Sequence, residues 1–414
     1  MSRENLNCIL VIGGGQAGAQ ALISLRQNGY EGALHLIAEE PFLPYQRPPL
    51  SKAYLKGEMA KERLAFKPQD WYESHNITLH LGVRADKIDR ENHILHLQDG
   101  TELTYDALII ATGARPRPLK LEGADLKGVQ DLRGLDDIDQ LRPALKRGTR
   151  LVIIGAGYIG LEAAAAARSL GAEVTVLEMA ERVLARVTSP VISTFFTQLH
   201  ERQGVSIRTK VRTDCLMGKA GHVSGVKLST GEELPADIVL VGIGVLPNQE
   251  LAEAAGILCE TGICVDEAGR TSDPDIFAAG DCTSRPLIHY DRRGRLESVH
   301  NAIEQGKCVA AALMEKPGPK LDVPWFWSDQ YHIKLQIAGL SQGYENFIVR
   351  GDPTSERFAV FYFKAGKLLG VDAINAPPEF LVTKKLIISG SALAPEELQD
   401  TSLSMKEIAA KYAA

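Results

Sequence analysis

Two clusters of glycines have the spacing that binds the pyrophosphate of a dinucleotide. In the pattern G-x-G-x-x-G, the first glycine permits a tight turn, the second lets the backbone approach the phosphates, and the third lets a helix pack closely on a strand. The clusters are Gly13, Gly15 and Gly18, and Gly155, Gly157 and Gly160. One such cluster could be a structural turn, whereas two indicate a protein that holds two dinucleotides.

Each cluster lies between an apolar run and a segment that favours a helix. The apolar runs are residues 8–12 and 151–154, and the helix-forming segments are residues 20–27 and 161–168. In the order strand, glycine turn, helix, the free N–H groups at the helix N-terminus face the phosphates. The surrounding sequence therefore supports the glycine pattern in both places.

An acidic residue ends the second predicted strand of each glycine unit. Residues 33–39 end at Glu39, and residues 173–178 end at Glu178. A carboxylate at this place accepts hydrogen bonds from the ribose hydroxyls of the dinucleotide. Glu40 is the alternative to Glu39, and we interpret it as a solvated loop acid.

Glu178 predicts which nicotinamide nucleotide binds at the second cluster. Its carboxylate would accept both ribose hydroxyls of NADH and would repel the extra phosphate of NADPH. Arg182 and Arg186 leave an alternative open, because an arginine can receive that phosphate. We predict a preference for NADH.

Length and composition are those of an ordinary globular protein. The 414 residues suggest about three domains. The net charge of -6 argues against a general affinity for nucleic acid or anionic membranes, and no apolar run approaches the length of a membrane span. We expect a cytoplasmic protein without a nucleic-acid or membrane partner, and leave monomer and dimer open.

The six cysteines and ten histidines offer no motif for redox or metal chemistry. None of the cysteines forms C-x-x-C. Cys259 and Cys264 have the spacing C-x-x-x-x-C, but Cys264 belongs to a predicted strand beyond the second glycine cluster. We interpret both as small apolar residues and predict no metal site.

The remaining segments predict how the domains are arranged. Residues 107–113 and 237–244 are apolar, as buried parallel strands are, and residues 275–281 form a further strand that resembles the closing segment of the first unit. The second nucleotide-binding domain is therefore inserted in the first. From residue 324 the sequence has no nucleotide-binding pattern. It predicts a β-hairpin at residues 357–373 and a helix that starts with a capping box at Ser404.

The predicted fold class is α/β, with two Rossmann-like dinucleotide-binding domains, the second inserted in the first, and a C-terminal α+β domain. Residues 1–115 and 248–323 are assigned to the first domain, residues 116–247 to the second, and residues 324–414 to the C-terminal domain.

Essentially the whole chain resembles the FAD-dependent ferredoxin reductases of bacterial oxygenase systems, the putidaredoxin-reductase type of the two-dinucleotide-binding flavoproteins. Besides the two glycine clusters, the resemblance rests on the segments RPPLSK at 47–52, ATG at 111–113, FAAGD at 277–281, ESVHNA at 297–302 and PWFWSD at 324–329.

The resemblance implies FAD on the first glycine cluster and NADH on the second. It places Glu39 on the adenosine ribose, Ala85 on the adenine, Arg133 near the pyrophosphate and Asp281 on the ribityl chain. The full set implied for FAD is Gly13, Gly14, Gly15, Ala17, Gly18, Glu39, Arg47, Lys52, Ala85, Thr112, Gly113, Arg133, Gly280, Asp281, Val299 and Trp327. The set implied for NADH is Gly155, Gly157, Tyr158, Ile159, Gly160, Glu162, Glu178, Arg186 and Gly244.

Three of these residues are implied to act at the reacting centre. Lys52 would lie beside the flavin ring and could pair with Glu162 near the nicotinamide, and Trp327 would shield the ring near the partner. Each has a plainer interpretation, because Lys52 could be a surface cation, Glu162 could only stabilise a helix N-terminus, and Trp327 could belong to a core.

The activity implied is electron transfer from NADH through FAD to an acidic 2Fe-2S ferredoxin that serves a haem-thiolate monooxygenase or a Rieske dioxygenase. Alternatives are a rubredoxin reductase or an NADH oxidase of the same fold, and a redox-switched interaction protein resembling apoptosis-inducing factor. The candidate cations for docking an acidic ferredoxin are Arg292, Arg293, Arg295, Lys307, Lys334, Lys384 and Lys385.

Overall fold

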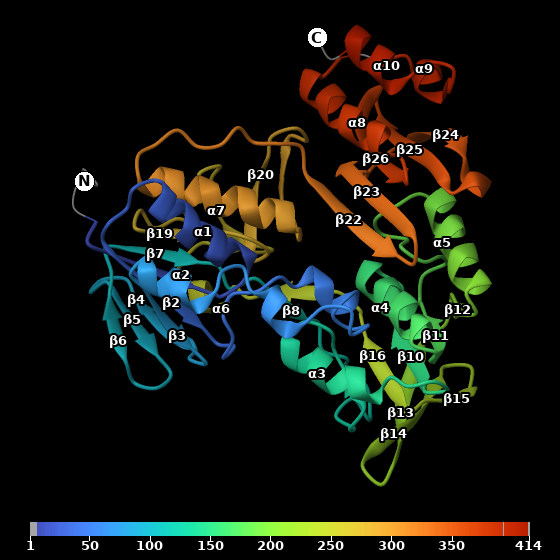
Figure 1. The fold of residues 1–414 in the computed structure, drawn as a ribbon, viewed down its shortest axis with the longest axis horizontal. Coiled ribbons are helices and arrows are strands. Elements are labelled where there is room, and N and C mark those ends of the chain that lie inside the picture. Colours follow the sequence, from blue (N-terminus) through green and yellow to red (C-terminus); the bar gives the residue numbers. More distant parts are fainter. Residues whose placement is uncertain (1–5, 392, 413–414) are drawn as a thin grey trace. The chain divides into compact units, whose positions relative to one another are not determined.

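The computed structural model describes residues 6–391 and 393–412. The chain forms two compact units, and each unit is assembled from separated segments (Figure 1). The first unit contains the residues up to Gln46, Glu62–Arg115 and Leu246–Pro324, and the second contains Arg47–Lys61, Pro116–Val245 and the residues from Trp325.

The first unit is built on a parallel five-stranded sheet. Its strands lie in the order β19-β7-β1-β2-β3. They are β1 (Cys8–Ile12), β2 (Ala33–Ala38), β3 (Ile77–Leu81), β7 (Ala107–Ile110) and β19 (Ile276–Ala278). The order reverses beside β1, and in such sheets ligands bind at the carboxyl ends of the strands where the order reverses.

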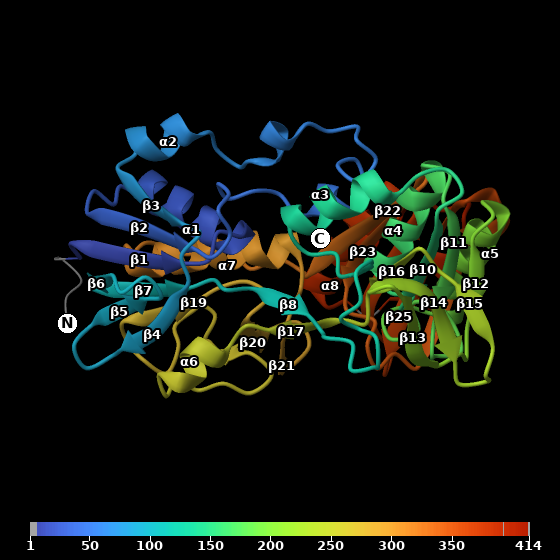
Figure 2. The ribbon, with the colours of Figure 1, turned by 90° about the horizontal axis from the view of Figure 1, so that it is seen from below.

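Two helices of the first unit, α1 (Gln16–Gln27) and α7 (Val299–Leu313), lie side by side in both views (Figures 1 and 2). A Cβ at Gly306 of α7 would lie 2.9 Å from the Ala17 carbonyl oxygen, so glycine permits this close approach. The apolar faces of α1 and α7 share one buried cluster with β1, β2 and β7.

The other elements of the first unit are short. They are α2 (Gln69–Ser74), β4 (Ala85–Asp89), β5 (Ile94–Leu97), β6 (Glu102–Thr104), α6 (Glu250–Ala254), β18 (Ile263–Cys264), β20 (Thr283–Leu287) and β21 (Arg292–Gly294). The 3-10 helix η2 (Lys61–Leu64) and the strands β8 (Ala114–Pro116) and β17 (Val245–Pro247) lie where the chain passes from one unit to the other.

The second unit repeats the parallel arrangement in the order β12-β11-β10-β16-β9. These strands are β9 (Val129–Gln130), β10 (Arg150–Ile154), β11 (Glu173–Leu177), β12 (Ser206–Arg208) and β16 (Ile238–Val241). The accompanying elements are η1 (Pro48–Ser51), α3 (Leu135–Ala144), α4 (Tyr158–Ser169), α5 (Pro190–Arg202), β13 (Thr213–Lys219), β14 (His222–Leu228) and β15 (Glu233–Pro235).

The C-terminal part of the second unit is an antiparallel sheet with three helices. Its strands lie in the order β22-β23-β26-β25-β24. The elements are β22 (Trp325–Gln330), β23 (Ile333–Gly339), β24 (Asn346–Asp352), η3 (Pro353–Ser355), β25 (Arg357–Lys364), β26 (Lys367–Ile374), α8 (Pro377–Ser389), α9 (Pro395–Gln399) and α10 (Met405–Tyr412). The predicted hairpin and capping box are confirmed, because β25 pairs with β26 and the Ser404 and Glu407 side chains each accept the other's backbone N–H.

The predicted fold class is confirmed, including the return of the chain to the first sheet through β19. Two details differ. The helices α1 and α4 begin directly after Gly15 and Gly157, which are their N-caps, rather than at residues 20 and 161. Residues 47–61 group with the second unit although the sequence assigns them to the first domain, because their side chains bond to α3 and α4.

In the described part of the chain, no helix is both long and apolar enough to span a bilayer.

Candidate functional site

The first glycine turn has a backbone that only glycine can adopt and an open face. Gly13 has a φ of +115°, and a Cβ there would lie 2.1 Å from the Ala111 carbonyl oxygen. A Cβ at Gly18 would lie 2.1 Å from the Gly13 carbonyl oxygen, so this glycine lets α1 pack on the turn. At Gly15, by contrast, no atom lies within 4 Å of the Cβ position. Two glycines are therefore needed for the turn, while the third leaves room for a ligand.

The N-terminus of α1 is suited to an anion. Gly15 is its N-cap and supplies no side-chain oxygen to the first N–H groups of the helix. Those groups are the donors that a pyrophosphate accepts from, and the helix dipole favours a negative charge there. The arrangement therefore fits the pyrophosphate of a dinucleotide.

Glu39 lies where the ribose acid was predicted. It directly follows β2, and its side chain is 74% exposed, so it is accessible to a nucleotide. The Glu40 carboxylate accepts a hydrogen bond from the Tyr45 hydroxyl and thus has a structural role. Glu39 as the ribose ligand stays a prediction, and the Tyr45 bond gives Glu40 a role of its own.

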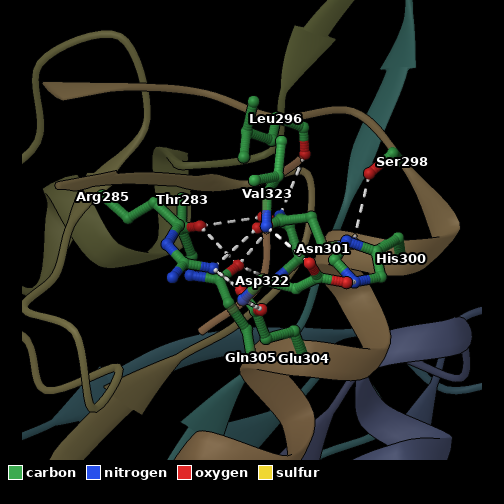
Figure 3. Close-up of polar contacts among 11 residues, drawn as sticks. Thr283, Arg285, Leu296, Ser298, His300, Asn301, Glu304, Gln305, Asp322 and Val323 are labelled. Carbon is green, nitrogen blue, oxygen red and sulfur yellow. Dashed lines mark hydrogen bonds and ion pairs between the residues drawn. The ribbon is translucent and has the colours of Figure 1, made fainter. Parts of the chain in front are cut away.

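A buried polar network in the first unit fixes the turn at Gly280 to α7. Figure 3 shows its side chains Thr283, Arg285, Asn301, Glu304 and Gln305. The Gln305 Oε1 atom accepts hydrogen bonds from the Gly280 N–H (2.8 Å), the Thr283 hydroxyl (2.9 Å) and the Asn301 amide (3.1 Å). An ion pair between Arg285 and Glu304 (2.7 Å) lies beside it, and Arg285 also donates to Asn301. The turn and the helix are thus held as one structure.

This network positions two of the residues implied for FAD. Asp281 follows Gly280, and Val299 is the first residue of α7, after the Ser298 N-cap. A Cβ at Gly280 would lie 2.9 Å from the Ala17 Cβ, which places this turn against the first glycine turn. The glycine turn, the Gly280 turn and the start of α1 are therefore adjacent in the first unit.

Four other residues implied for FAD also lie in the first unit. The Thr112 hydroxyl donates to the Asn248 carbonyl (2.6 Å), and the Asn248 N–H donates to the Gly113 carbonyl (2.9 Å). Ala85 is the first residue of β4. Gly14 lies close to β2, since a Cβ there would be 3.1 Å from the Ala38 Cβ.

The second glycine turn repeats the geometry of the first. Gly155 has a φ of +106°, and a Cβ there would lie 2.3 Å from the Gly242 carbonyl oxygen. Gly160 packs against the Gly155 carbonyl in the same way, while nothing lies within 4 Å of the Cβ position of Gly157. Gly157 is the N-cap of α4 and supplies no capping side chain. This turn fits a second pyrophosphate.

Glu178 is already bonded to the second glycine turn. Its carboxylate accepts the Ala156 N–H (2.9 Å) and the Ala180 N–H (2.8 Å). Each carboxylate oxygen can accept more than one hydrogen bond, so ribose hydroxyls can be added. The acid predicted to bind the nucleotide thus also holds the second glycine turn.

The two arginines near Glu178 differ in their surroundings. Arg182 donates to the Ser193 hydroxyl (2.5 Å) and to the Ala185 carbonyl (3.0 Å), so it braces its own loop. Arg186 is exposed. Gly244, also implied for NADH, is exposed with a φ of +106°.

Tyr158 and Ile159 open α4 and face different surroundings. Ile159 is 44% exposed. The Tyr158 ring packs edge-on against Phe326, and burial raises the pKa of its hydroxyl well above the ordinary value, with a smaller effect from the charges of Asp372 and Tyr362. Tyr158 therefore stays protonated.

Lys52 and Glu162 form a buried ion pair in the second unit, which confirms the expected pairing. The Lys52 Nζ atom lies 2.5 Å from the Glu162 Oε2 atom, and the two side chains are 19% and 5% exposed. The Ser51 hydroxyl donates to the same oxygen (2.6 Å), and the Ser328 hydroxyl donates to the other oxygen (2.7 Å). Glu162 is therefore an ionised carboxylate with donors on both oxygens.

The segment that carries Lys52 is anchored at three further points. Arg47 donates to the Arg133 carbonyl (2.8 Å), Tyr54 donates to Asp139 (2.6 Å), and Lys61 pairs with Asp139 (2.9 Å). Prolines at the start of η1 pre-set its first turn. Lys52 is thus held in place rather than left as a surface cation.

Trp327 lies on the face of β22 opposite to Ser328, because side chains alternate along a strand. Its ring lies 5.8 Å from that of Trp325, which packs on Phe380 of α8. Trp327 therefore shares a face with Trp325, whereas Glu162 is bonded from the other face.

The two cysteines with the C-x-x-x-x-C spacing, Cys259 and Cys264, are unsuited to thiolate chemistry. All six are unpaired. Burial raises the pKa of the Cys259 thiol to about 11 and also raises that of Cys264. Both are protonated at neutral pH and are poor nucleophiles. Within the described residues, no group of three His, Cys, Asp or Glu side chains could hold a metal ion.

Sequence reasoning missed Ser51, Ser328 and Gln305. Ser51 and Ser328 could have been proposed from the sequence, since they adjoin Lys52 and Trp327. No sequence pattern indicates Gln305, because its role depends on the fold bringing it to Gly280.

Two Rossmann-like folds with open glycine turns, together with a buried Lys–Glu pair, define an oxidoreductase that binds two dinucleotides. Residues 8–306 match the pyridine nucleotide-disulphide oxidoreductase family, and residues 325–409 match the reductase C-terminal family. The chain belongs to the pyridine nucleotide-disulphide oxidoreductase family. It is an enzyme whose cofactors are FAD and NAD(H).

Relatives match along nearly the whole chain. Rhodocoxin reductase of Rhodococcus erythropolis is 43% identical over 404 residues, which cover 98% of this chain and 95% of the relative. A rubredoxin-NAD(+) reductase of Pseudomonas putida is 38% identical over 369 residues, 89% of this chain and 96% of the relative. The crystal structure of the covalent putidaredoxin reductase-putidaredoxin complex matches with a TM-score of 0.97, 42% identity and coverage of 99% and 100%.

Proposed function

We propose that this protein transfers electrons from NADH through FAD to a 2Fe-2S ferredoxin that supplies an oxygenase. The observation that carries the proposal is the pair of open glycine turns, each at an uncapped helix N-terminus, with the Lys52–Glu162 pair four residues into the second helix. FAD, when bound, accepts a hydride from NADH and gives up electrons singly, as a one-electron carrier requires.

The residues of the chain supply binding and electrostatics to this reaction. We assign FAD to the turn at Gly13–Gly18 and NADH to the turn at Gly155–Gly160. The positive charge of Lys52 favours negative charge on the reduced ring, and Glu162 holds that charge in place. Arg47 and Arg133 would meet the FAD pyrophosphate, and Trp327 would cover the ring near the partner.

The partner is proposed from the relatives. Several are named as reductases of ferredoxins, and one was solved in a covalent complex with putidaredoxin. The decisive experiment reduces a panel of purified 2Fe-2S ferredoxins with NADH and catalytic amounts of this protein, followed by coupling to a haem-thiolate or a Rieske oxygenase. Rapid reduction of at least one ferredoxin supports the proposal. Slow reduction of every ferredoxin favours instead the redox-switched interaction protein that resembles apoptosis-inducing factor.

A rubredoxin reductase is the second candidate, because relatives of that name match most of this chain. Including a rubredoxin in the panel decides between the two acceptors. An NADH oxidase is less favoured, since residues 42–51 hold none of the catalytic cysteines that such enzymes commonly carry there. The cytoplasm is the proposed compartment, in keeping with six unpaired thiols.

NADH is expected to be preferred over NADPH by about tenfold or more in kcat/KM. Glu178 carries a negative charge on the second glycine turn, and a 2′-phosphate beside it would be repelled. Replacing Glu178 with Gln removes the charge but keeps an oxygen for the Ala156 N–H, so the preference should shrink. Steady-state kinetics with both nucleotides measure it. Equal kcat/KM values in the wild type would contradict the assignment.

Ferredoxin reduction is expected to weaken as the salt concentration rises. Exposed cations that attract an acidic partner are screened within about 10 Å at 0.1 M salt. Among the candidates, Arg293 donates to two backbone carbonyls and Lys334 pairs with Asp329, whereas Lys307 and Lys385 are exposed. Stopped-flow reduction of the flavin by NADH, which needs no ferredoxin, is the control. A rate of ferredoxin reduction that does not change with salt concentration would contradict a docking role for these cations.

A further inference from the structure

A line of hydrogen bonds runs from Glu162 through the C-terminal sheet to α5. Ser328 donates to Glu162 (2.7 Å), Gln330 lies 3.1 Å from the Ser328 hydroxyl, and His200 lies 2.8 Å from Gln330. The Tyr331 hydroxyl lies 3.1 Å from the other ring nitrogen of His200. All five residues belong to the second unit.

The pleat of β22 and the position of α5 make this line possible. Ser328 and Gln330 are two residues apart on one strand, so their side chains share the face that meets Glu162. Ser328, Gln330 and His200 are 1%, 0% and 0% exposed. In such surroundings each hydrogen bond is strong, and a missing one is costly.

The charge of Glu162 sets the direction of every bond in the line. A carboxylate only accepts, so the single proton of Ser328 points to Glu162 and the Ser328 oxygen must accept from the Gln330 Nε2 group. The Gln330 Oε1 atom then faces His200 and must accept from its Nε2–H. His200 is left with a bare Nδ1, which accepts from the Tyr331 hydroxyl.

A neutral His200 completes the line. A protonated ring would carry a proton on Nδ1, and the Tyr331 hydroxyl could no longer donate there. Burial lowers the pKa of His200, and the Gln330 bond offsets this only in part. The ring is thus a neutral Nε2–H tautomer at physiological pH.

We propose that Ser328, Gln330 and His200 are positioning residues that hold the Glu162 carboxylate in its ion pair with Lys52 and thereby support reduction of the flavin by NADH. The proposal rests on the proposed role of Glu162 and is independent of which protein accepts the electrons. The line does more than satisfy buried polar groups. Each of its four bonds is donated towards the Glu162 end, from Tyr331 to His200, Gln330, Ser328 and finally Glu162.

The test compares variants that remove a donor with variants that keep it. Ser328→Ala removes the donor to Glu162, and Ser328→Thr keeps a hydroxyl. His200→Leu removes the Nε2–H group, and His200→Gln keeps an amide N–H at similar reach. Ser224→Ala is the matched control, because it removes a hydroxyl of β14 that donates to the Met217 carbonyl of β13.

Stopped-flow reduction of the flavin by NADH is measured on each holoenzyme. The limiting rate of Ser328→Ala is expected to fall about tenfold, the change that corresponds to 1.36 kcal/mol in the barrier. The Kd of NADH should change by less than about twofold, because the nucleotide itself loses no contact. Ser328→Thr and His200→Gln should recover most of the rate, and Ser224→Ala should match the wild type.

Two further measurements separate the possible outcomes. In a Glu162→Gln background, Ser328→Ala should cause no further loss, because the carboxylate it serves is gone. Nitrogen-15 NMR of the histidine rings, with His200→Gln to assign the signal, should show one Nε2–H tautomer for His200.

Several results would overturn the proposal. Wild-type rates in Ser328→Ala beside a slow Glu162→Gln variant would remove the positioning role and leave that of Glu162 intact. A fast Glu162→Gln variant would refute the proposed role of Glu162 together with the inference. Additive losses of rate in the Glu162→Gln, Ser328→Ala double variant would refute the positioning role alone. A protonated His200 would likewise refute the inferred direction of the hydrogen bonds.

Discussion

Replacing Lys52 with methionine is expected to slow the reduction of the flavin by NADH about 100-fold, in the range seen when a preorganised electrostatic group is removed from a reacting centre. Methionine keeps the unbranched chain up to the Cε atom but removes the ammonium group, whose charge is proposed to favour the reduced ring. It also leaves Glu162, only 5% exposed, without its cation. Stopped-flow bleaching of the flavin measures the rate.

Stability has to be separated from this rate. Breaking a buried ion pair by removing one partner costs about 3–5 kcal/mol, so the melting temperature should fall as well. Adding Glu162→Gln to Lys52→Met removes the uncompensated charge and should restore stability without restoring the rate. A double variant that regained the rate would contradict the role of Lys52.

Lys61→Met is the matched control for Lys52→Met. Lys61 lies in the same segment and forms an ion pair with Asp139 at 2.9 Å, but its side chain is 42% exposed. Exposed pairs contribute about 0–1 kcal/mol, so both stability and rate should stay close to those of the wild type. A similar loss in both lysine variants would point to the segment rather than to Lys52.

Valine at Gly15 is expected to abolish stable retention of FAD, whereas valine at Gly157 should leave FAD bound and raise the KM for NADH about tenfold or more. Both residues have ordinary φ values of -84° and -80° with open space at the Cβ position, so both variants should fold. The added side chain would occupy the approach to the pyrophosphate, and overpacking of about 1–3 kcal/mol corresponds to roughly tenfold or more.

The two glycine variants test which dinucleotide lies on which turn. The flavin content of the purified protein and steady-state NADH kinetics are the measurements. Exchanged phenotypes would reverse the assignment. Gly13→Ala is the contrasting case, since its Cβ would clash with the Ala111 carbonyl and its φ of +115° disfavours alanine, so this variant should fail to fold.

The local elements of the fold could be predicted from the sequence because their signals are local. The parallel strands β1 and β10 are short apolar runs, and the glycines after them specify the turns. The capping box at Ser404 spans four residues, and the β25–β26 hairpin has a short turn. Each feature depends on residues that are close together in the chain.

The arrangement around Glu162 could not be predicted beyond the pairing with Lys52. Ser51 and Ser328 reach the same carboxylate from segments separated from it by 111 and 166 residues. The membership of residues 47–61 in the second unit depends likewise on bonds to α3 and α4. A sequence shows that such a residue can donate, but only the fold shows to what.

The interrupted first unit constrains the order in which the protein can mature during synthesis. Its sheet lacks the edge strand β19 until the ribosome has made residues 276–278, and α1 lacks its neighbour α7 until still later. At about 5–20 residues per second, the interval between β7 and β19 lasts roughly ten to thirty seconds. The parallel sheet of the inserted segment is complete within that interval. The nascent chain therefore completes the parallel sheet behind its second glycine turn before the sheet behind its first.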